Sequence, residues 1–294
     1  MHPFLFCPAC RSANTGAAFE VKDHSISGET FGIFKCADCS FHFTNPVPEE
    51  ALIGKYYQSQ DYISHSNTSK GFINRMYQRV RNYTLKGKRN LIRKQTGKAR
   101  GTLLDIGCGT GNFLNAMKEA GWEIAGIEPS PEAREQAQKN FNIQPQEAAA
   151  IYQLPDGKFD AITMWHVLEH VYDLDGYMTK IRSMLAKGGK AFIAVPNHNA
   201  PDAKKYGTYW AAWDVPRHLY HFNPASMKTL LQRSGFRLIR MKKMPFDSFY
   251  VSLLSEKYRK GSMLRGAWIG FRSWLAALFN VERCSSVIYI MEAA

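Results

Sequence analysis

The sequence predicts an α/β protein with a doubly wound, mostly parallel sheet of seven strands, preceded by a small cysteine-rich module. Three observations predict this fold class. Strand-like and helix-like segments alternate from residue 101 onward, a glycine-rich turn joins the first strand to the next helix, and two Cys-x-x-Cys pairs stand near the N-terminus. The composition is 45% hydrophobic and 21% charged, as in ordinary globular proteins, so we expect no extensive disorder.

The cysteine pairs, at 7–10 and 36–39, predict a metal-binding ribbon over residues 1–48. Two residues between the thiolates suit a tight knuckle that turns both sulfurs toward one ion, and two knuckles complete a tetrahedral site. Two disulfides are the alternative, which the lack of a signal-peptide pattern disfavours. Because four sulfurs leave no open position for a reactive water, we expect a structural zinc ion. Its ligands would be Cys7, Cys10, Cys36 and Cys39.

Residues 49–98 predict a helical, basic linker or lid. All nine charged residues between Lys70 and Arg100 are basic, and the whole chain carries a net charge of +13. This charge suits an anionic partner, such as a phosphorylated substrate, nucleic acid or an acidic membrane face. A solvated helix face and an anion-binding surface both remain open for this segment.

Residues 99–294 predict the main α/β domain, with an insert at about 245–285. We expect its strands at 102–106, 123–127, near 143, 159–164, 190–195, 236–241 and 287–291. We expect its helices at 112–120, from 131 onward, at 174–185 and at 224–234. The aromatic stretch 197–222 interrupts the alternation, and a loop of that length in a compact domain usually serves a function.

The glycine turn follows the strand at 102–106, with the spacing G-x-G-x-G rather than the G-x-G-x-x-G of dinucleotide-binding folds. Glycines let the backbone approach a ligand closely and adopt positive φ. Asp105, before the turn, can bind a cationic amino group. Glu128, at the end of the next strand, can accept hydrogen bonds from ribose hydroxyls. Together these features predict a site for an adenosine ligand at the carboxyl ends of the strands.

The segments 103–111, 159–171 and 185–197 resemble the class I S-adenosylmethionine (SAM) dependent methyltransferases, particularly the branch with small-molecule, sugar and quinone methyltransferases. The cysteine ribbon and the segment 213–222 resemble zinc-ribbon methyltransferases more loosely. The resemblance implies a Rossmann-like fold and SAM as cofactor, with the methionine moiety at Asp105, the ribose at Glu128, and the adenine or methyl group at Trp165. The implied cofactor site consists of Asp105, Gly107, Cys108, Gly109, Gly111, Glu128, Pro129, Trp165 and His166.

One position departs from that family. Many relatives carry an acidic residue after the third strand to hold the adenine amine, whereas this chain has alanines at 148–150. We therefore expect backbone groups or Glu147 to hold the adenine.

A methyltransferase must align its acceptor and manage the acceptor's proton, and histidine is the natural base near neutral pH. The candidate bases are His218, His170, His166 and His221. We favour His218, because the neighbouring Arg217 could hold an acidic group of the acceptor, and His170 after it. Each histidine could instead bond a backbone carbonyl, and catalysis by proximity and orientation alone stays open.

Residues 262–279 predict an amphipathic helix. On a period of 3.6 residues, Arg265, Arg272 and Ser273 share one side and large apolar residues share the other. Such a helix could lie on a membrane surface, pack on a substrate lid or contact a dimer partner. No apolar run is long enough to span a bilayer. We expect a cytoplasmic protein, peripheral to the inner face of a membrane if this helix binds lipid.

The sequence thus predicts a SAM-dependent methyltransferase for a small-molecule acceptor: a sugar, a lipid or another metabolite, with an anionic group compatible with the net charge. The alternatives are a zinc-ribbon RNA methyltransferase and a non-catalytic SAM-fold scaffold. The Asn/Asp-Pro-Pro-aromatic tetrapeptide of base methylases is absent after the strand at 159–164, where Trp165-His166-Val-Leu stands. Its absence disfavours nucleic acid as the acceptor.

Overall fold

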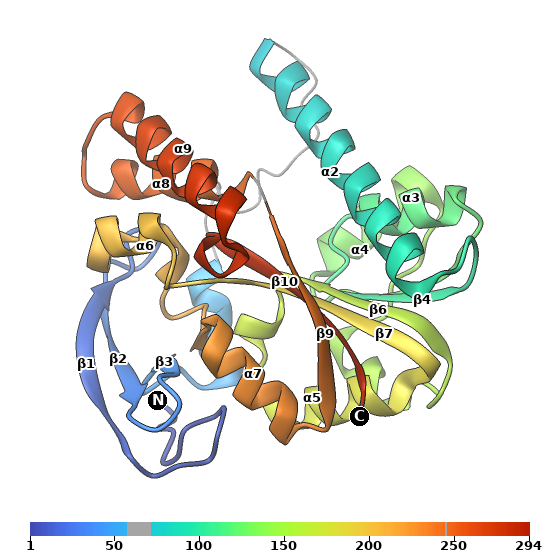
Figure 1. Ribbon diagram of the computed structural model, residues 1–294, viewed down its shortest axis with the longest axis horizontal. Coiled ribbons are helices and arrows are strands. Elements are labelled where there is room, and N and C mark those ends of the chain that lie inside the picture. The colour runs from blue at the N-terminus through green and yellow to red at the C-terminus, as the bar shows by residue number, and fades with distance from the viewer. Residues whose placement is uncertain (58–71, 245) are drawn as a thin grey trace. The chain divides into compact units, whose positions relative to one another are not determined.

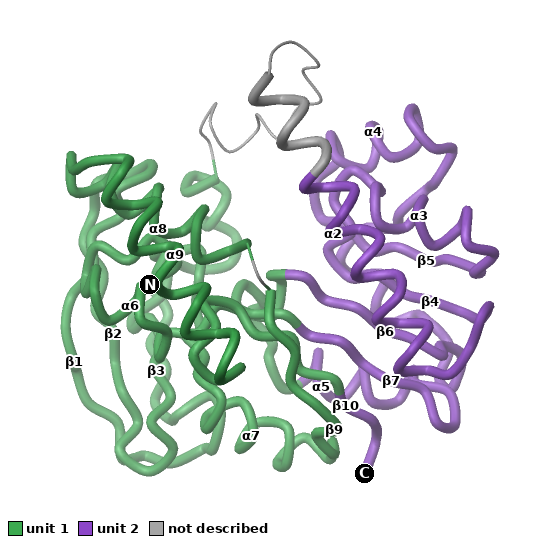
Figure 2. Tube along the Cα trace, turned by 45° about the horizontal axis from the view of Figure 1, so that its top comes forward, with its two compact units in different colours: residues 1–62, 166–175, 194–290 green, residues 63–165, 176–193, 291–294 purple. Residues whose placement is uncertain are grey.

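The computed structural model describes residues 1–57, 72–244 and 246–294, which belong to two compact units (Figure 2). Unit 1 comprises residues 1–62, 166–175 and 194–290, and unit 2 comprises residues 63–165, 176–193 and 291–294. The domain limits inferred from the sequence stay a prediction, and these units group the chain differently. Residues 58–71 of the expected basic linker, and position 245 of the insert, lie outside the described residues.

Unit 2 carries the parallel strands that the alternating pattern predicts. β4 (Thr102–Ile106) pairs in parallel with β5 (Glu123–Ile127) and with β6 (Phe159–Trp165). Their side chains are mostly apolar and buried, as in parallel sheets covered on both faces. The helices of this region are α2 (Phe72–Thr96), α3 (Asn112–Glu119), α4 (Pro131–Phe141), α5 (Leu174–Met184) and the 3-10 helix Ala148–Gln153 (Figure 1). Ser130 caps α4, because its hydroxyl accepts the N–H of Ala133.

The sheet that contains these strands has the order β5-β4-β6-β7-β10-β9. Its other strands are β7 (Leu185–Pro196), β9 (Phe236–Lys243) and β10 (Ser286–Ala293). The α/β fold class is confirmed, but the described residues supply six strands to this sheet rather than seven. Near residue 143 the chain makes a single parallel bridge, between Ile127 and Gln146. Pro145 lacks an N–H and cannot continue a ladder toward residue 143, so no strand forms there.

Unit 1 contains an antiparallel sheet of order β1-β2-β3-β8. The strands are β1 (Thr15–Lys22), β2 (Thr30–Cys36), β3 (His42–Thr44) and β8 (Tyr220–His221). The first three flank the cysteine pairs. β8 comes from much later in the chain and pairs Tyr220 with Phe43 and His221 with His42. The cysteine-rich module therefore shares its sheet with the aromatic segment 197–222.

The segment 197–222 is not the long loop that the sequence suggested. It contains α6 (Pro201–Tyr206), the 3-10 helices Gly207–Tyr209 and Ala211–Trp213, and β8. Its aromatic residues Tyr206, Trp210 and Trp213 are buried in one cluster with side chains of β1 and β2. They form a hydrophobic core for unit 1, which explains the composition of the segment without an exposed loop.

The insert forms a hairpin of α8 (Asp247–Tyr258) and α9 (Met263–Phe279) in unit 1 (Figure 1). α9 packs closely on α8 because small residues face it: a Cβ at Gly270 would lie 2.9 Å from the Cα of Phe249. Ser273, which the sequence placed on the basic side, is buried on this small-residue face and donates its hydroxyl hydrogen to Asp202.

The remaining elements of unit 1 are short. They are α7 (Pro224–Arg233) and the 3-10 helices Glu50–Tyr57, Leu168–His170 and Val281–Arg283. Within the part of the chain that the structure describes, no helix is long and apolar enough to cross a membrane.

The helix contact can be tested by paired glycine substitutions. Gly270→Ala should lower the free energy of unfolding by about 1–3 kcal/mol, because the added methyl overlaps the backbone of α8. Gly87→Ala, in α2, should raise it by about 0.5–1 kcal/mol, because alanine is the better helix former and an added Cβ there meets nothing within 4 Å. Urea unfolding followed by circular dichroism measures both. A neutral Gly270→Ala would contradict the close contact.

Candidate functional site

The glycine turn of unit 2 is bare on one side and packed on the other. Gly107, Gly109 and Gly111 have φ of 72°, 54° and 78°, a region that favours glycine. A Cβ at Gly109 would meet nothing within 4 Å, whereas one at Gly111 would lie 3.0 Å from the Cβ of Ala137. The turn therefore fixes the start of α3 against α4 and leaves its backbone open at Gly109.

Two buried carboxylates flank this turn. Asp105 is 1% exposed and accepts the hydroxyl hydrogen of Thr163. Burial raises the pKa of Asp105 to about 7, although Thr163 and the charge of Lys88 act in the opposite direction. Glu128 accepts the N–H of Gly109 at 2.7 Å and the N–H of Ser130 at 2.9 Å, so it ties the turn to the end of β5.

Lys88 and Trp165 form the other wall of this site in unit 2. The ammonium of Lys88, on α2, lies 4.1 Å from the centre of the Trp165 ring, and Phe113 packs edge-on against the same ring at 5.6 Å. The indole Nε1–H of Trp165 is buried without a hydrogen-bond partner among the described residues. A buried donor of this kind is satisfied when a ligand supplies an acceptor. Sequence reasoning missed Lys88, because nothing distinguishes it within a run of basic residues.

Unit 1 holds a second polar cluster, which begins at His166. This residue has a φ of 60°, which is uncommon for residues other than glycine, although His adopts it more readily than most. Its Nδ1 lies 3.3 Å from Glu169 and its Nε2 3.0 Å from Asp247, so both ring nitrogens donate to carboxylates. Burial alone would lower the pKa of His166, but the hydrogen bonds to Asp247 and Glu169 raise it to about 10. His166 is therefore a cation at neutral pH.

His170 and His218 face each other next to Glu169, with ring centres 4.6 Å apart. The Nδ1–H of His170 donates to the carbonyl of Arg217 at 2.9 Å, and that of His218 to the carbonyl of Ala212 at 2.9 Å. These bonds use the Nδ1 atoms and leave the Nε2 atoms for other partners. Burial and the neighbouring His218 lower the pKa of His170 to about 4, so its ring is neutral. Glu169 is 0% exposed, and its Oε2 has no hydrogen-bond partner in the described chain.

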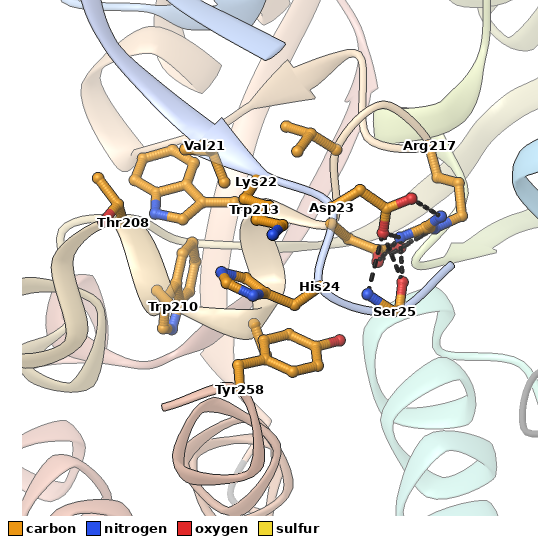
Figure 3. A pocket seen from close by; sticks show the side chains of 13 residues that line it. Val21, Lys22, Asp23, His24, Ser25, Thr208, Trp210, Trp213, Arg217 and Tyr258 are labelled. Carbon is orange, nitrogen blue, oxygen red and sulfur yellow. Dashed lines mark hydrogen bonds and ion pairs between the residues drawn. The ribbon is translucent and has the colours of Figure 1, made fainter. Parts of the chain in front are cut away.

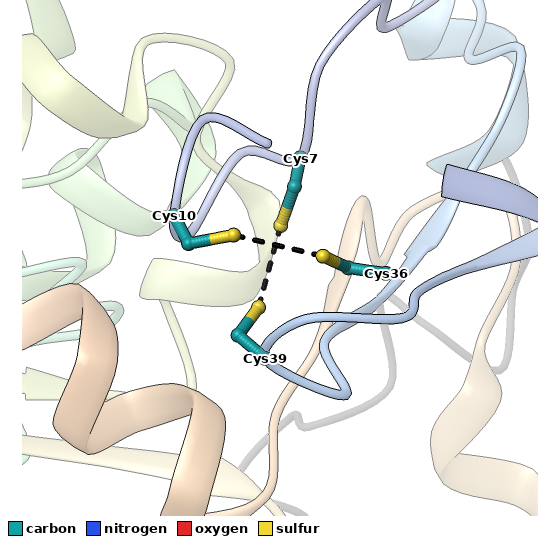
Figure 4. Close-up of side chains that lie close together, drawn as sticks. All are labelled: Cys7, Cys10, Cys36 and Cys39. Atoms are coloured by element: carbon teal, nitrogen blue, oxygen red, sulfur yellow. Dashed lines mark hydrogen bonds between the residues drawn. The ribbon is translucent and has the colours of Figure 1, made fainter. Parts of the chain in front are cut away.

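The four cysteines of the N-terminal module converge on one point in unit 1 (Figure 4). The Sγ atoms of Cys7 and Cys39 are 3.5 Å apart, and those of Cys10 and Cys36 are 3.6 Å apart. Four thiolates at the usual zinc–sulfur distance are about 3.8 Å from one another in a tetrahedron, so the separations fit a metal ion. All six cysteines lie in the described residues, and none forms a disulfide.

Comparison with known proteins identifies the family of this chain. A family model described as "Methyltransferase domain" matches residues 77–240, which is more than half of the chain. This chain belongs to the class I SAM-dependent methyltransferases.

Several proteins similar to this methyltransferase are named for reactions of small molecules. The chain is 28% identical over 160 residues to a ubiquinone biosynthesis O-methyltransferase of Xanthomonas axonopodis pv. citri (strain 306). The matched region covers 49% of this chain and 66% of the relative, so the chain spans just under two thirds of the relative's length. It is 31% identical over 153 residues to the enzyme of that name from Brucella anthropi, covering 47% and 60%. A magnesium protoporphyrin IX methyltransferase from Synechocystis PCC 6803, solved with SAH, shares the fold, with a TM-score of 0.55, 14% identity, and coverage of 84% and 100%.

Arg217 was expected to hold an acidic group of the methyl acceptor, but in the structure it binds groups of the protein itself. Its guanidinium is 1% exposed and donates to Asp23, Asp214 and Ser25, and to the carbonyl of Tyr56. We call Arg217 with these partners the clamp. Figure 3 shows Arg217 with Asp23 and Ser25 beside a small pocket. These bonds leave no N–H group of Arg217 for the methyl acceptor, because a buried guanidinium needs all its partners inside the protein.

The other predicted residues of the methyltransferase divide between the two units. Asp105, the three glycines, Cys108, Glu128, Pro129 and Trp165 lie in unit 2, and the four histidines lie in unit 1. His221 is buried, its Nε2 lies 3.0 Å from the hydroxyl of Thr44, and its ring packs on Trp213. Its ring thus serves the packing of the antiparallel sheet. The cofactor and catalytic roles of the remaining residues stay predictions.

Proposed function

We propose that this methyltransferase transfers the methyl group of SAM to a hydroxyl-bearing small molecule. The observation that supports this best is the bare backbone at Gly109 beside the buried carboxylate of Asp105. A cationic amino acid moiety would compensate a buried carboxylate, and an open glycine turn admits it. SAM brings its own electrophilic methyl group, so the protein has only to bind, orient and manage one proton.

In this proposal the residues of unit 2 bind the cofactor. Asp105 accepts hydrogen bonds from the α-amino group, and Lys88 pairs with the carboxylate of the methionine moiety. Glu128 keeps its bond to Gly109 and uses its remaining lone pairs for the ribose hydroxyls. Trp165, with its unpaired indole N–H, borders the adenine or the methyl group, together with Cys108 and Pro129. Backbone groups or Glu147 hold the adenine.

The residues of unit 1 handle the acceptor in this proposal. His170, whose ring is neutral, and His218 present their Nε2 atoms, and one of them accepts the proton of the acceptor hydroxyl. The buried carboxylate of Glu169 stabilises the imidazolium that results, as a carboxylate does beside other catalytic histidines. His166 remains protonated and acts as a hydrogen-bond donor rather than a base. We assign no catalytic role to His221.

Support for the class of acceptor comes from the relatives, whose names place them in ubiquinone biosynthesis. A sugar, a lipid or another hydroxylated metabolite would fit the same chemistry. RNA is the second candidate, and the positive net charge of +13 is the observation in its favour.

The pKa of Asp105 makes cofactor binding depend on pH. A carboxyl with a pKa of about 7 is neutral below that value and cannot pair with the amino group of SAM. Because that amino group itself titrates at about 7.7–8.0, SAM affinity should fall roughly fivefold between pH 7.5 and pH 6.0. Isothermal calorimetry measures this. Asp105→Asn should bind weakly with little dependence on pH. A native protein that does not bind SAM, or binds it equally at both pH values, would contradict the assignment.

The proposed base predicts a selective loss of turnover. Methyl-labelled SAM, incubated with a ribonuclease-treated metabolite extract, should deliver label to the small-molecule fraction. His218→Ala and His170→Ala should slow this transfer by roughly 10²–10⁴-fold, while SAM affinity stays constant. The matched control is His24→Ala, because the His24 ring stacks between Tyr209 and Tyr258 and has no role in the proposed reaction. This variant should transfer the methyl group at the parent rate. Label that appears only in untreated RNA would support the second candidate instead.

We also propose that the four cysteines bind one structural zinc ion. The purified protein should contain one zinc per chain by elemental analysis, and Cys36→Ser should contain less than a tenth of that. Because the ion orders the module, the same variant should melt at a lower temperature. Cys284→Ser, a buried thiol outside the cluster, should retain its zinc. Equal zinc content in the two variants would remove this assignment.

A further inference from the structure

The hairpin of α8 and α9 exposes a row of large apolar side chains in unit 1. We call this row the α9 stripe. Its members follow one another at intervals of three and four residues, so they lie along one face of the helix. They are Leu264, Trp268, Phe271, Leu275 and Leu278, with Met263 and Phe279 at the two ends. Leu264 and Phe279 are 84% and 85% exposed.

The stripe is held in place by the opposite face of the same helix. Gly266 and Gly270 pack on the backbone of α8, and Ser273 donates to the buried Asp202. Trp268, Phe271 and Trp274 stack in succession, with ring centres 5.9 Å and 5.8 Å apart. Single exposed apolar residues are common on protein surfaces, whereas an ordered row of this length marks an interaction surface.

The charges around the stripe indicate the chemistry of its partner. From residue 257 to residue 281 the chain contains no Asp or Glu. It contains five basic residues there, all exposed: Lys257, Arg259, Lys260, Arg265 and Arg272. Large apolar and aromatic side chains bordered by Lys and Arg, on a helix that does not span a membrane, are typical of helices that lie in the headgroup region of an anionic bilayer.

We propose that α9 docks this methyltransferase on the surface of an anionic lipid bilayer. The 17-residue helix lies parallel to the membrane over about 25 Å, with the stripe at the boundary between headgroups and acyl chains. Lys260 and Arg272 pair with lipid phosphates, and Arg265 keeps its ion pair with Glu256. A second copy of the chain fits this surface less well, because an antiparallel twofold pairing of the two helices would bring Arg272, near the middle of α9, toward its own counterpart. The surface does not depend on the identity of the methyl acceptor.

Flotation with vesicles tests the proposal on the full chain. The protein should float with vesicles of phosphatidylcholine containing 30% phosphatidylglycerol, and much less with phosphatidylcholine alone. Binding should weaken as the salt concentration rises, because the basic residues are exposed. The double variant Trp268→Asp/Leu275→Asp should reduce the partition coefficient at least tenfold. Lys260→Gln/Arg272→Gln should reduce it roughly thirtyfold, from the surface potential alone.

The matched control is Leu52→Asp/Ile239→Asp, which adds the same charge at exposed apolar positions elsewhere in unit 1 and should bind as the parent does. The circular dichroism spectrum and the SAM affinity should be unchanged in all variants. The spectrum separates loss of membrane docking from misfolding, and the SAM affinity separates it from failure of the proposed cofactor site. The proposal is overturned if the parent does not float with anionic vesicles at low salt, or if the Trp268/Leu275 variant floats equally well. It is also overturned if the parent is a dimer that binds no lipid and the same variant is a monomer.

Discussion

The arrangement of unit 1 depends on one buried cation. The guanidinium of Arg217 lies almost fully out of water, and the cost of burying its charge is compensated because Asp23 and Asp214 pair with it. Those partners come from the turn after β1 and from the residues just before Arg217, and the carbonyl of Tyr56 adds a third segment. The same residue offers its own carbonyl to His170. One ionic clamp therefore joins the cysteine-rich module to the segment that positions the proposed base.

Unit 2 shows the opposite use of buried charge. Among the residues that the structure describes, no guanidinium pairs with Asp105, and its carboxyl is held by Thr163 at the edge of an open turn. A carboxylate in that environment is energetically unfavourable in the free protein, and a cationic ligand relieves the cost. The clamp in unit 1 is satisfied internally and serves stability, whereas we propose that the carboxyl in unit 2 pairs with a ligand. In that proposal one buried charge of the chain is structural and the other functional.

Local patterns predicted most of the fold and part of the site. The glycine spacing, the Ser130-Pro131 cap and the paired cysteines each depend on neighbouring residues, so the sequence reveals them directly. The roles of Arg217 and Lys88 depend on distant partners. Asp23 lies almost two hundred residues before Arg217, and Lys88 is one of many basic residues on its helix. Aromatic residues in 197–222 suggested a functional loop because burial in a core leaves the same compositional signal.

The pairing of β3 with β8 has a consequence for the modularity of the chain. The cysteine ribbon looks like a detachable N-terminal appendage, but the last strand of its sheet is contributed by residues 220–221. A shortened chain beginning at Gly101 would retain the glycine turn and both carboxylates, but it would lose Lys88 and the neighbour of that strand. Removal of the ribbon would leave the backbone of Tyr220 and His221 without its sheet partner, two residues from His218.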